Sequence, residues 1–289
     1  FAIWDNELQK LTLARDRFGV KPLYYTQIGD LFLFGSEVKA FRGHSAYSTK
    51  LDLAGLQEYL TFQNFFTDRT LFQDVKMLPQ GCTLEVKMGS GATPTPVSFW
   101  DYDFQEPEGK YDERAAVDEL DHLFRQAVQR QLISDVDVGS YLSGGMDSGS
   151  ITALAARELP FMRTFTVGFD LSSASGVELG YDERARAEHM SYQFKTEHYE
   201  MVLKAGDMER SMSKLAWHLD EPRVGQSYPN YYAAKLSSKF VKVCLSGAGG
   251  DELFGGYPWR YYRAVVNNDF DDYIQKYYGF WQRMLVNGS

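Results

Sequence analysis

The stretch SYLSGGMDSGS, residues 140–150, decides the fold. It follows a strand-like apolar run at residues 136–142 and opens a helix-like run at residues 147–158. Gly144 and Gly145 lack Cβ atoms, so the backbone between the two runs can turn tightly and approach a ligand. The stretch therefore predicts a close strand-to-helix connection with exposed backbone N–H groups.

Strand-like and helix-like segments alternate through the rest of the C-terminal part. Short apolar runs that are typical of buried strands occupy residues 163–169, 197–203 and 240–245. Helical segments are expected at residues 112–132, 182–194, 207–219 and 229–238, and after Asp251. The first of these helices places six apolar side chains on one face: Val117, Leu120, Leu123, Phe124, Val128 and Leu132. This alternation predicts an α/β fold, with a mostly parallel sheet and helices on both faces.

The first hundred residues have a different pattern, rich in strands and turns. Residues 10–16 and 31–38 carry alternating or continuous apolar runs, and residues 71–86 are interpreted as a strand pair around Pro79–Gly81. The polar stretch QEPEGKYD, residues 105–112, is the best candidate for a linker. We therefore predict two domains, residues 1–104 and residues 105–289.

Composition and charge argue against several classes of protein. The chain has 289 residues, 44% of them hydrophobic, and its net charge of −9 disfavours nucleic acid as a partner. No apolar run reaches about 18 residues and no secretion signal opens the chain, so no membrane association is expected. Cys82 and Cys244 form no disulfide framework or CxxC pair, which favours a reducing, cytoplasmic compartment. Because Phe1 opens a strand-like run, we expect a piece of a longer protein.

Residues 143–148 lie where parallel sheets bind ligands, beyond the carboxyl end of a strand. The N–H groups and the dipole of the following helix would attract an anion, and Ser143 and Ser148 add hydroxyl donors. Asp147 fits such a site if a cation is present, because Mg²⁺ takes carboxylate oxygens together with substrate phosphates. The alternative is a tight turn in which Asp147 or Ser148 merely caps the helix.

A second stretch, VCLSGAGGDELFGGY at residues 243–257, repeats this design. It again combines an apolar strand, Ser-Gly, further glycine, an aspartate and the start of a helix. Helix capping explains each loop singly, but two such loops in one sheet favour a shared nucleotide site.

Three motifs, in their order and spacing, resemble the asparagine synthetase class B (glutamine-hydrolysing) family. LSGGMDS, residues 142–148, is similar to the pyrophosphate-binding SGGxDS loop of ATP pyrophosphatases that adenylate a carboxylate. LSGAGGDELFGGYPWRY, residues 245–261, resembles the second signature of the family. LARDRFGVKPLYY and FGSEVKAF, residues 13–25 and 34–41, resemble the last strands of its glutamine amidotransferase domain.

The resemblance implies a fold and a reaction. The tail of an Ntn-type α+β amidotransferase domain, with stacked antiparallel sheets, would precede a synthetase domain of the adenine nucleotide α-hydrolase type, incomplete at its C-terminus. The implied reaction is ATP-dependent adenylation of aspartate, followed by attack of glutamine-derived ammonia to give asparagine, AMP and pyrophosphate. The implied cofactors are ATP and Mg²⁺, the partners are these small molecules, and a homodimer is one expected form.

The resemblance also implies roles for particular residues. Asp147 and Asp251 would be the catalytic carboxylates that share Mg²⁺ and the departing pyrophosphate. The residues expected to hold the nucleotide are Leu142, Ser143, Gly144, Gly145, Asp147, Ser148, Val167, Ser246 and Gly247. The stretch DEPRVGQSYPNYY, residues 220–232, would lie near the acceptor substrate. Glu221 and Arg223 are the candidate residues there, although an exposed charged loop is the equal alternative.

Three departures from the family keep other functions open. The N-terminal nucleophilic cysteine and the later lysine-bearing segments of the family are absent from these 289 residues. The family's usual acidic residue in the second signature is Ala248 here, so Glu252 or Glu221 would have to supply a base. The alternatives are an amidotransferase for another carboxylate (a uronic acid, a peptide or a β-amino acid) and a nucleotide-binding fragment without turnover.

Overall fold

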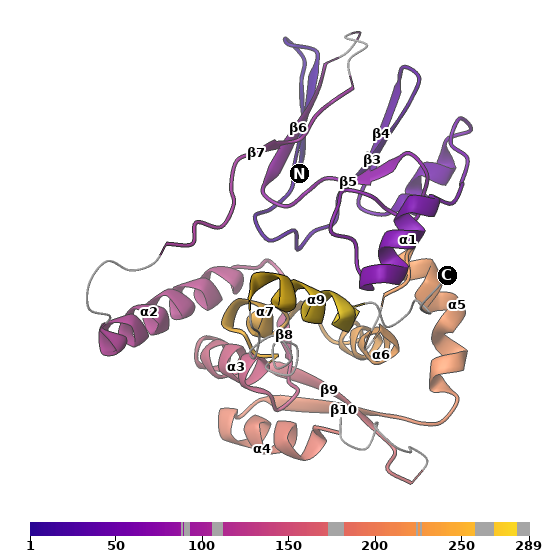
Figure 1. Ribbon diagram of the computed structural model, residues 1–289. Helices are drawn as coiled ribbons and strands as arrows, with labels where there is room; N and C mark the ends of the chain where they lie inside the picture. The colour runs from indigo at the N-terminus through magenta and orange to yellow at the C-terminus, as the bar shows by residue number, and fades with distance from the viewer. Residues whose placement is uncertain are drawn as a thin grey trace. The chain divides into compact units, whose positions relative to one another are not determined.

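The computed structural model describes residues 1–87, 89, 93–105, 112–172, 182–223, 225, 227–257 and 269–281. The chain forms two compact units (Figure 1). The first unit comprises Phe1–Glu106, His218–Val224 and Ala264–Ser289, and the second comprises Pro107–Trp217 and Gly225–Arg263. The predicted linker lies mostly in residues 106–111, outside the described residues, so the domain boundary stays a prediction.

The first unit contains two antiparallel sheets. One has the order β1-β2-β6-β7, formed by Ala2–Asp5, Lys10–Ala14, Cys82–Lys87 and Val97–Ser98. The other has the order β4-β3-β5, formed by Leu31–Gly35, Tyr24–Ile28 and Val75–Met77. The helical elements are the 3₁₀ helix Val38–Gly43, α1 (Leu53–Phe62) and α9 (Phe270–Trp281).

The core of the first unit joins the two sheets. Leu13 and Leu84 from one sheet pack with Tyr25 from the other, around the fully buried Leu78. The predicted pairing of two strands within residues 71–86 is wrong, because β5 and β6 belong to different sheets. The chain changes sheets at Gly81, whose φ is +63° and whose added Cβ would lie 2.4 Å from the Trp100 carbonyl oxygen.

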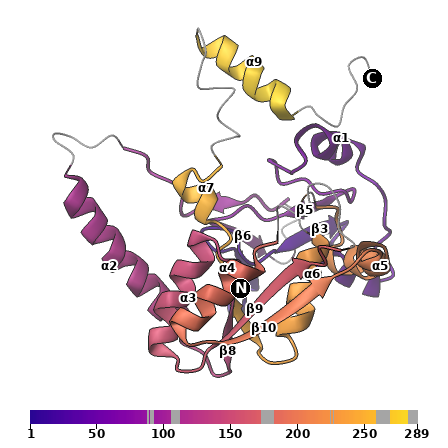
Figure 2. The same ribbon diagram turned by 90° about the horizontal axis from the view of Figure 1, so that it is seen from below.

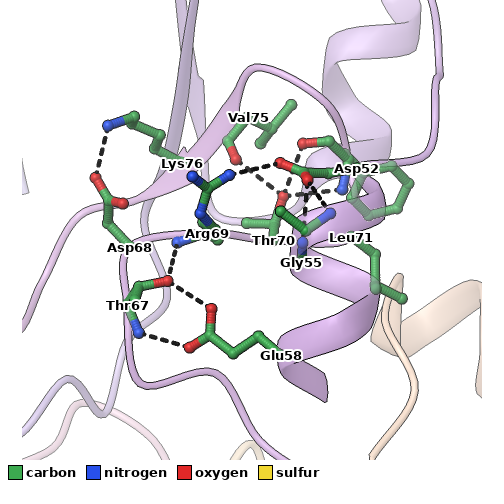
Figure 3. A network of polar contacts seen from close by, with 12 residues as sticks. Asp52, Gly55, Glu58, Thr67, Asp68, Arg69, Thr70, Leu71, Val75 and Lys76 are labelled. Atoms are coloured by element: carbon green, nitrogen blue, oxygen red, sulfur yellow. Dashed lines mark hydrogen bonds and ion pairs between the residues drawn. The ribbon is translucent and has the colours of Figure 1, made fainter. Parts of the chain in front are cut away.

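Hydrogen bonds and an ion pair hold the loop that follows α1, around residues 67–71, against that helix (Figure 3). Asp52 caps the helix by accepting hydrogen bonds from the N–H groups of Ala54 and Gly55, and it also pairs with Arg69. Glu58 accepts hydrogen bonds from the backbone N–H and the hydroxyl of Thr67. These contacts set the course of the loop towards Leu71.

The second unit contains a four-stranded parallel sheet in the order β10-β9-β8-β11, which confirms the predicted α/β class. Its strands are Val138–Tyr141 (β8), Arg163–Phe169 (β9), Glu197–Leu203 (β10) and Val243–Leu245 (β11). Its helices are Glu113–Gln131 (α2), Met146–Glu158 (α3), Arg184–Phe194 (α4), Asp207–Leu219 (α5), Ser227–Ser237 (α6) and Gly250–Phe254 (α7). Both α4 and α6 pack on β9 and β10, and Figure 1 shows them on opposite faces.

Helix α2 packs on the rest of the second unit through its C-terminal half. Val128 is buried in a cluster with Val138, Ala155 and Met162, and both views show α2 beside α3 (Figures 1 and 2). Of the six residues predicted to form an apolar face on this helix, those near its C-terminus pack in the core. The three nearest its N-terminus are exposed: Val117, Leu120 and Leu123. Within the described part of the chain, no helix is both long and apolar enough to cross a bilayer.

Candidate functional site

The order of the parallel strands identifies the place where a ligand would bind. The chain runs from β8 outward through β9 to β10 and then returns to place β11 on the other side of β8. The connections that leave β8 and β11 therefore diverge at the carboxyl ends of adjacent strands. In open α/β sheets, such a switch point is the usual position of the ligand crevice.

The loop after β8 turns at Gly144. Its φ is +77°, a conformation that glycine adopts without steric cost, and an added Cβ would lie 2.5 Å from the Cβ of Arg186 in α4. Gly145 occupies the N-cap position of α3 and, having no side chain, cannot accept a hydrogen bond from the first N–H groups of the helix. The start of α3 therefore presents its backbone and the positive end of its dipole to the crevice.

Two serine hydroxyls brace this loop. Ser143 Oγ lies 2.9 Å from Ser148 Oγ, and Ser148 Oγ accepts a 3.1 Å hydrogen bond from the Ser143 N–H. The Gly145 N–H donates to Ser143 Oγ over 3.3 Å. Both hydroxyls, predicted as donors to a phosphate, therefore already take part in hydrogen bonds within the loop.

The loop after β11 lies directly against the first loop. An added Cβ on Gly247 would be 2.7 Å from the Ser148 backbone nitrogen, and one on Gly250 would be 2.3 Å from the Asp147 carboxylate. Gly249, with φ +105°, turns the chain into α7. The glycines of the second signature thus permit the close approach of two loops that lie a hundred residues apart in sequence.

A cavity of about 710 Å³ opens between these loops, a volume within the usual range for small-molecule sites. Helix α6 contributes Pro229, Asn230 and Ala233 to the wall, and β9 contributes Phe165 and Thr166. Nine predicted site residues line it, together with Ala248: Leu142, Ser143, Gly145, Asp147, Ser148, Val167, Ser246, Gly247 and Asp251. The two predicted loops therefore form one pocket.

Four predicted residues lie outside this pocket lining. Gly144 lies on the side of the loop that packs against α4, next to Arg186. Glu252, one of the two suggested bases, accepts a 3.0 Å hydrogen bond from the Tyr257 hydroxyl. Glu221 and Arg223 belong to the first unit, where buried Glu221 accepts a 2.7 Å hydrogen bond from the Leu71 N–H. Burial raises the pKa of the Glu221 carboxyl, although this hydrogen bond lowers it in part.

Nine residues of the pocket lining were not named among the site residues predicted from sequence, and three polar ones among them bear on the site. Glu183 comes from the N-terminus of α4, Asn230 from α6, and Thr166 from β9, where its hydroxyl donates to the Leu142 carbonyl oxygen. Glu183 lies at the start of the helix that follows β9, the strand beside β8. This position could have identified it as a candidate site residue from the sequence. Asn230 belongs to the stretch 220–232 that was expected near the acceptor, but it was not singled out there.

The pocket residues fit a magnesium ion delivered with a polyphosphate. Asp147 and Asp251 supply carboxylate oxygens from the two facing loops. Among the described residues, no group of three or more His, Cys, Asp or Glu side chains is arranged to hold a metal. Magnesium usually binds through one or two carboxylates, substrate phosphates and water, so two aspartates beside an anion site suffice.

A parallel α/β sheet with two serine-glycine loops at its switch point defines a class of phosphate-binding α/β proteins. A sequence profile described as asparagine synthase matches residues 119–288, and one described as glutamine amidotransferase domain matches residues 1–100. The chain belongs to the asparagine synthase family.

Similar proteins include two from Bacillus subtilis strain 168. Asparagine synthetase (glutamine-hydrolysing) 1 is 33% identical over 89% of this chain and 39% of its own length. Asparagine synthetase (glutamine-hydrolysing) 3 is 32% identical over 99% of this chain and 48% of its own length. Among solved structures, an NMN synthetase from Francisella tularensis has a TM-score of 0.31 and 13% identity over 60% of this chain and 71% of that one. The chain thus spans less than half the length of the curated relatives it matches.

Proposed function

We propose that the pocket between the two loops binds Mg-ATP. The observation that carries this proposal is the meeting of both serine-glycine loops at the switch point, with Gly247 against the Ser148 nitrogen. Backbone N–H groups at the start of α3 would face the phosphates. Leu142 and Val167, at the ends of adjacent strands, would flank the adenosine, and Ser246 and Gly247 would meet the nucleotide from the second loop.

Asp147 and Asp251 would hold the magnesium ion. When bound, Mg²⁺ neutralises phosphate charge and so eases the departure of pyrophosphate. The protein's own contribution is to orient the ATP, since the loop geometry is already set by Gly144, the serine hydroxyls and the contact of Gly247. The pocket residues Asn230 and Thr166 add polar groups that could fix the position of the substrate.

We propose further that the whole protein is a carbon–nitrogen ligase that adenylates a carboxylate for attack by glutamine-derived ammonia. Aspartate is the default acceptor, with asparagine, AMP and pyrophosphate as products. This proposal is supported by membership of the asparagine synthase family and by the amidotransferase profile over residues 1–100. A cytoplasmic homodimer is the form we expect in the cell.

A second candidate is an amidotransferase for a carboxylate other than aspartate. It is favoured by Ala248, which lines the pocket without the carboxylate that the family usually has at this position. Neither suggested replacement lines the pocket: the Glu252 carboxylate accepts a hydrogen bond from Tyr257, and Glu221 belongs to the first unit. The room that alanine leaves would suit a larger acceptor.

ATP–pyrophosphate exchange by the full-length protein, with a panel of carboxylates, separates the candidates. The proposed function predicts exchange that depends on aspartate. Exchange with a uronic acid, a peptide or a β-amino acid alone would assign the second candidate. ATP binding without exchange for any acid would leave a nucleotide-binding module without turnover.

A further inference from the structure

The two central strands of the parallel sheet end at different points beside the pocket. Strand β8 ends at Tyr141, which pairs with Phe165, whereas β9 continues past that residue. One more backbone hydrogen bond joins them beyond β8, from the Leu142 N–H to the Phe165 carbonyl oxygen over 3.0 Å. The following residues of β9 therefore form an open edge along the pocket wall, and Thr166 and Val167 both line the cavity.

A side-chain hydrogen bond replaces the next bond of the ladder. In a parallel pair, that bond would run from the Val167 N–H to the Leu142 carbonyl oxygen. In the structure, the Thr166 hydroxyl donates to this carbonyl instead. Leu142 is 1% exposed, so its carbonyl needs a donor from the protein. Within the described part of the chain, the Thr166 hydroxyl is the donor that satisfies it.

The backbone of Val167 is left open as a result. Val167 lies two residues after Phe165, so its N–H and carbonyl point to the same side of β9, towards the place where β8 would continue. Among the described residues, neither group has a backbone partner there. The pocket wall thus offers one donor and one acceptor side by side. Adenine matches this pair with a ring nitrogen and an amine, whereas guanine carries a protonated nitrogen and an oxygen.

Thr164 provides a comparison on the same face of β9. Both threonines are buried, and Thr164 precedes Thr166 by two residues. The Thr164 hydroxyl lies 2.9 Å from the Thr196 hydroxyl and 2.9 Å from His198 Nδ1, outside the pocket lining. The two hydroxyls therefore share a strand, a face and a buried setting, but Thr166 is the one that bonds to the end of β8 beside the pocket.

We propose that Thr166 is a positioning residue: its hydroxyl occupies the Leu142 carbonyl, so that the Val167 N–H stays free to donate to the base of a bound nucleotide. This role rests on the proposed binding of Mg-ATP. Without the hydroxyl, the buried Leu142 carbonyl would lack a donor, and the Val167 N–H is the next donor in register. The ladder would then extend by one bond, and the pocket would lose the donor that meets a ring nitrogen of adenine.

Calorimetric titrations of the 289-residue chain with Mg-ATP and with Mg-GTP test this role. The wild type should prefer ATP by roughly tenfold or more, because the base contributes one or two matched hydrogen bonds. Thr166→Val keeps the shape of the side chain without its hydroxyl. It should lose about tenfold in affinity for ATP and keep its affinity for GTP. Thr166→Ser retains the hydroxyl and should retain the preference for ATP.

Hydrogen exchange of the Val167 amide, followed by NMR, gives a readout that does not depend on affinity. In the free wild type this amide should exchange fast, as expected for an unpaired N–H at a pocket wall, and Mg-ATP should slow its exchange. In free Thr166→Val the amide should already be protected, because it pairs with the Leu142 carbonyl. The wild-type measurement tests the proposal even if Thr166→Val folds poorly, since a slow Val167 amide without ligand would overturn it.

Thr164→Val is the matched control. It removes a buried hydroxyl from the same face of the same strand, away from the pocket lining, and should keep the wild-type preference for ATP. A similar loss of preference in Thr164→Val would overturn the inference, because general disturbance of β9 would then be sufficient.

The other outcomes reject different claims. Unchanged ATP affinity and unchanged Val167 exchange in Thr166→Val would overturn the inference, as would equal losses of affinity for ATP and GTP. A wild type that binds Mg-ATP and Mg-GTP equally well would overturn the inference and leave the proposed Mg-ATP site standing. A folded wild type that binds no Mg-ATP would reject the proposed function and the inference together.

Discussion

Gly144 illustrates how a single residue can serve a site without lining it. The motif suggests that its missing side chain leaves room for a phosphate. In the structure, the space that a Cβ would fill is occupied by Arg186 and the Ala187 nitrogen of α4, and the residue needs φ +77°. The glycine is therefore required for the packing of the loop against α4, and only indirectly for the ligand.

Gly144→Ala should lower the stability of the second unit as well as ligand binding. A positive φ at alanine costs about 1 kcal/mol, and the clash with Arg186 should add roughly 1–3 kcal/mol. Gly29→Ala is the matched control, because Gly29 has φ +59° and nothing within 4 Å of the added Cβ. Urea unfolding should show a larger loss for Gly144→Ala. Equal losses would mean that the contact with α4 contributes nothing.

Asp147 is expected to act through the cation. Asp147→Ala should weaken nucleotide binding in the presence of Mg²⁺ by roughly tenfold or more, the loss expected when one charge-assisted contact is removed. Binding in the presence of a chelator should change much less. Calorimetric titrations with ATP, with and without Mg²⁺, measure both quantities. Equal loss under the two conditions would contradict the metal role.

The two cysteines should be unable to support glutamine hydrolysis. Burial raises the pKa of the Cys82 thiol, and it raises that of Cys244 to about 12, so both stay protonated near neutral pH. Residues 1–289 alone should therefore release no ammonia from glutamine in a coupled ammonia assay. Release of ammonia that disappears in Cys82→Ala or Cys244→Ala would show that one of them is activated after all.

At the scale of elements, the parallel part of the fold could be predicted because its signals are local. Apolar strands followed by glycine and then by helical periodicity mark β8–α3 and β11–α7 within a few residues each. The sheet change at Gly81 could not be predicted, since strand pairing depends on distant partners such as β2 and β3. Glu183 was missed for the same reason, because the folding of α4 brings it to the pocket. Asn230 was included in the stretch expected near the acceptor but was not singled out, because the packing of α6 decides which of its residues reach the pocket.

Helix α2 offers a test of which apolar positions stabilise the second unit. Val128 is 5% exposed and Val117 is 57% exposed, on one predicted face of one helix. Val128→Ala should cost about 2 kcal/mol through lost burial and a cavity, whereas Val117→Ala should stay within about 0.5 kcal/mol. Denaturant unfolding monitored by circular dichroism compares the two. Similar losses would mean that the N-terminal half of α2 is covered in solution.

At the scale of the whole molecule, the two units correspond to two kinds of sheet, antiparallel in the first and parallel in the second. The proposed ligand pocket lies entirely among residues of the second unit. The proposed binding of Mg-ATP can therefore be tested on this chain, whereas the proposed amide formation is to be tested on the full-length protein. The pocket and the ligase reaction are separate claims with separate experiments.

The contact between the two loops is the basis of the proposed site, and Gly247→Ala tests it most directly. The added Cβ would lie 2.7 Å from the Ser148 nitrogen and force the loops apart. Gly43→Ala, with nothing within 4 Å of its Cβ, is the control. In calorimetric titrations with Mg-ATP, wild type and Gly43→Ala should bind equally, and Gly247→Ala roughly tenfold more weakly or worse. Tight binding by folded Gly247→Ala, or no binding by the folded wild type, would contradict the account.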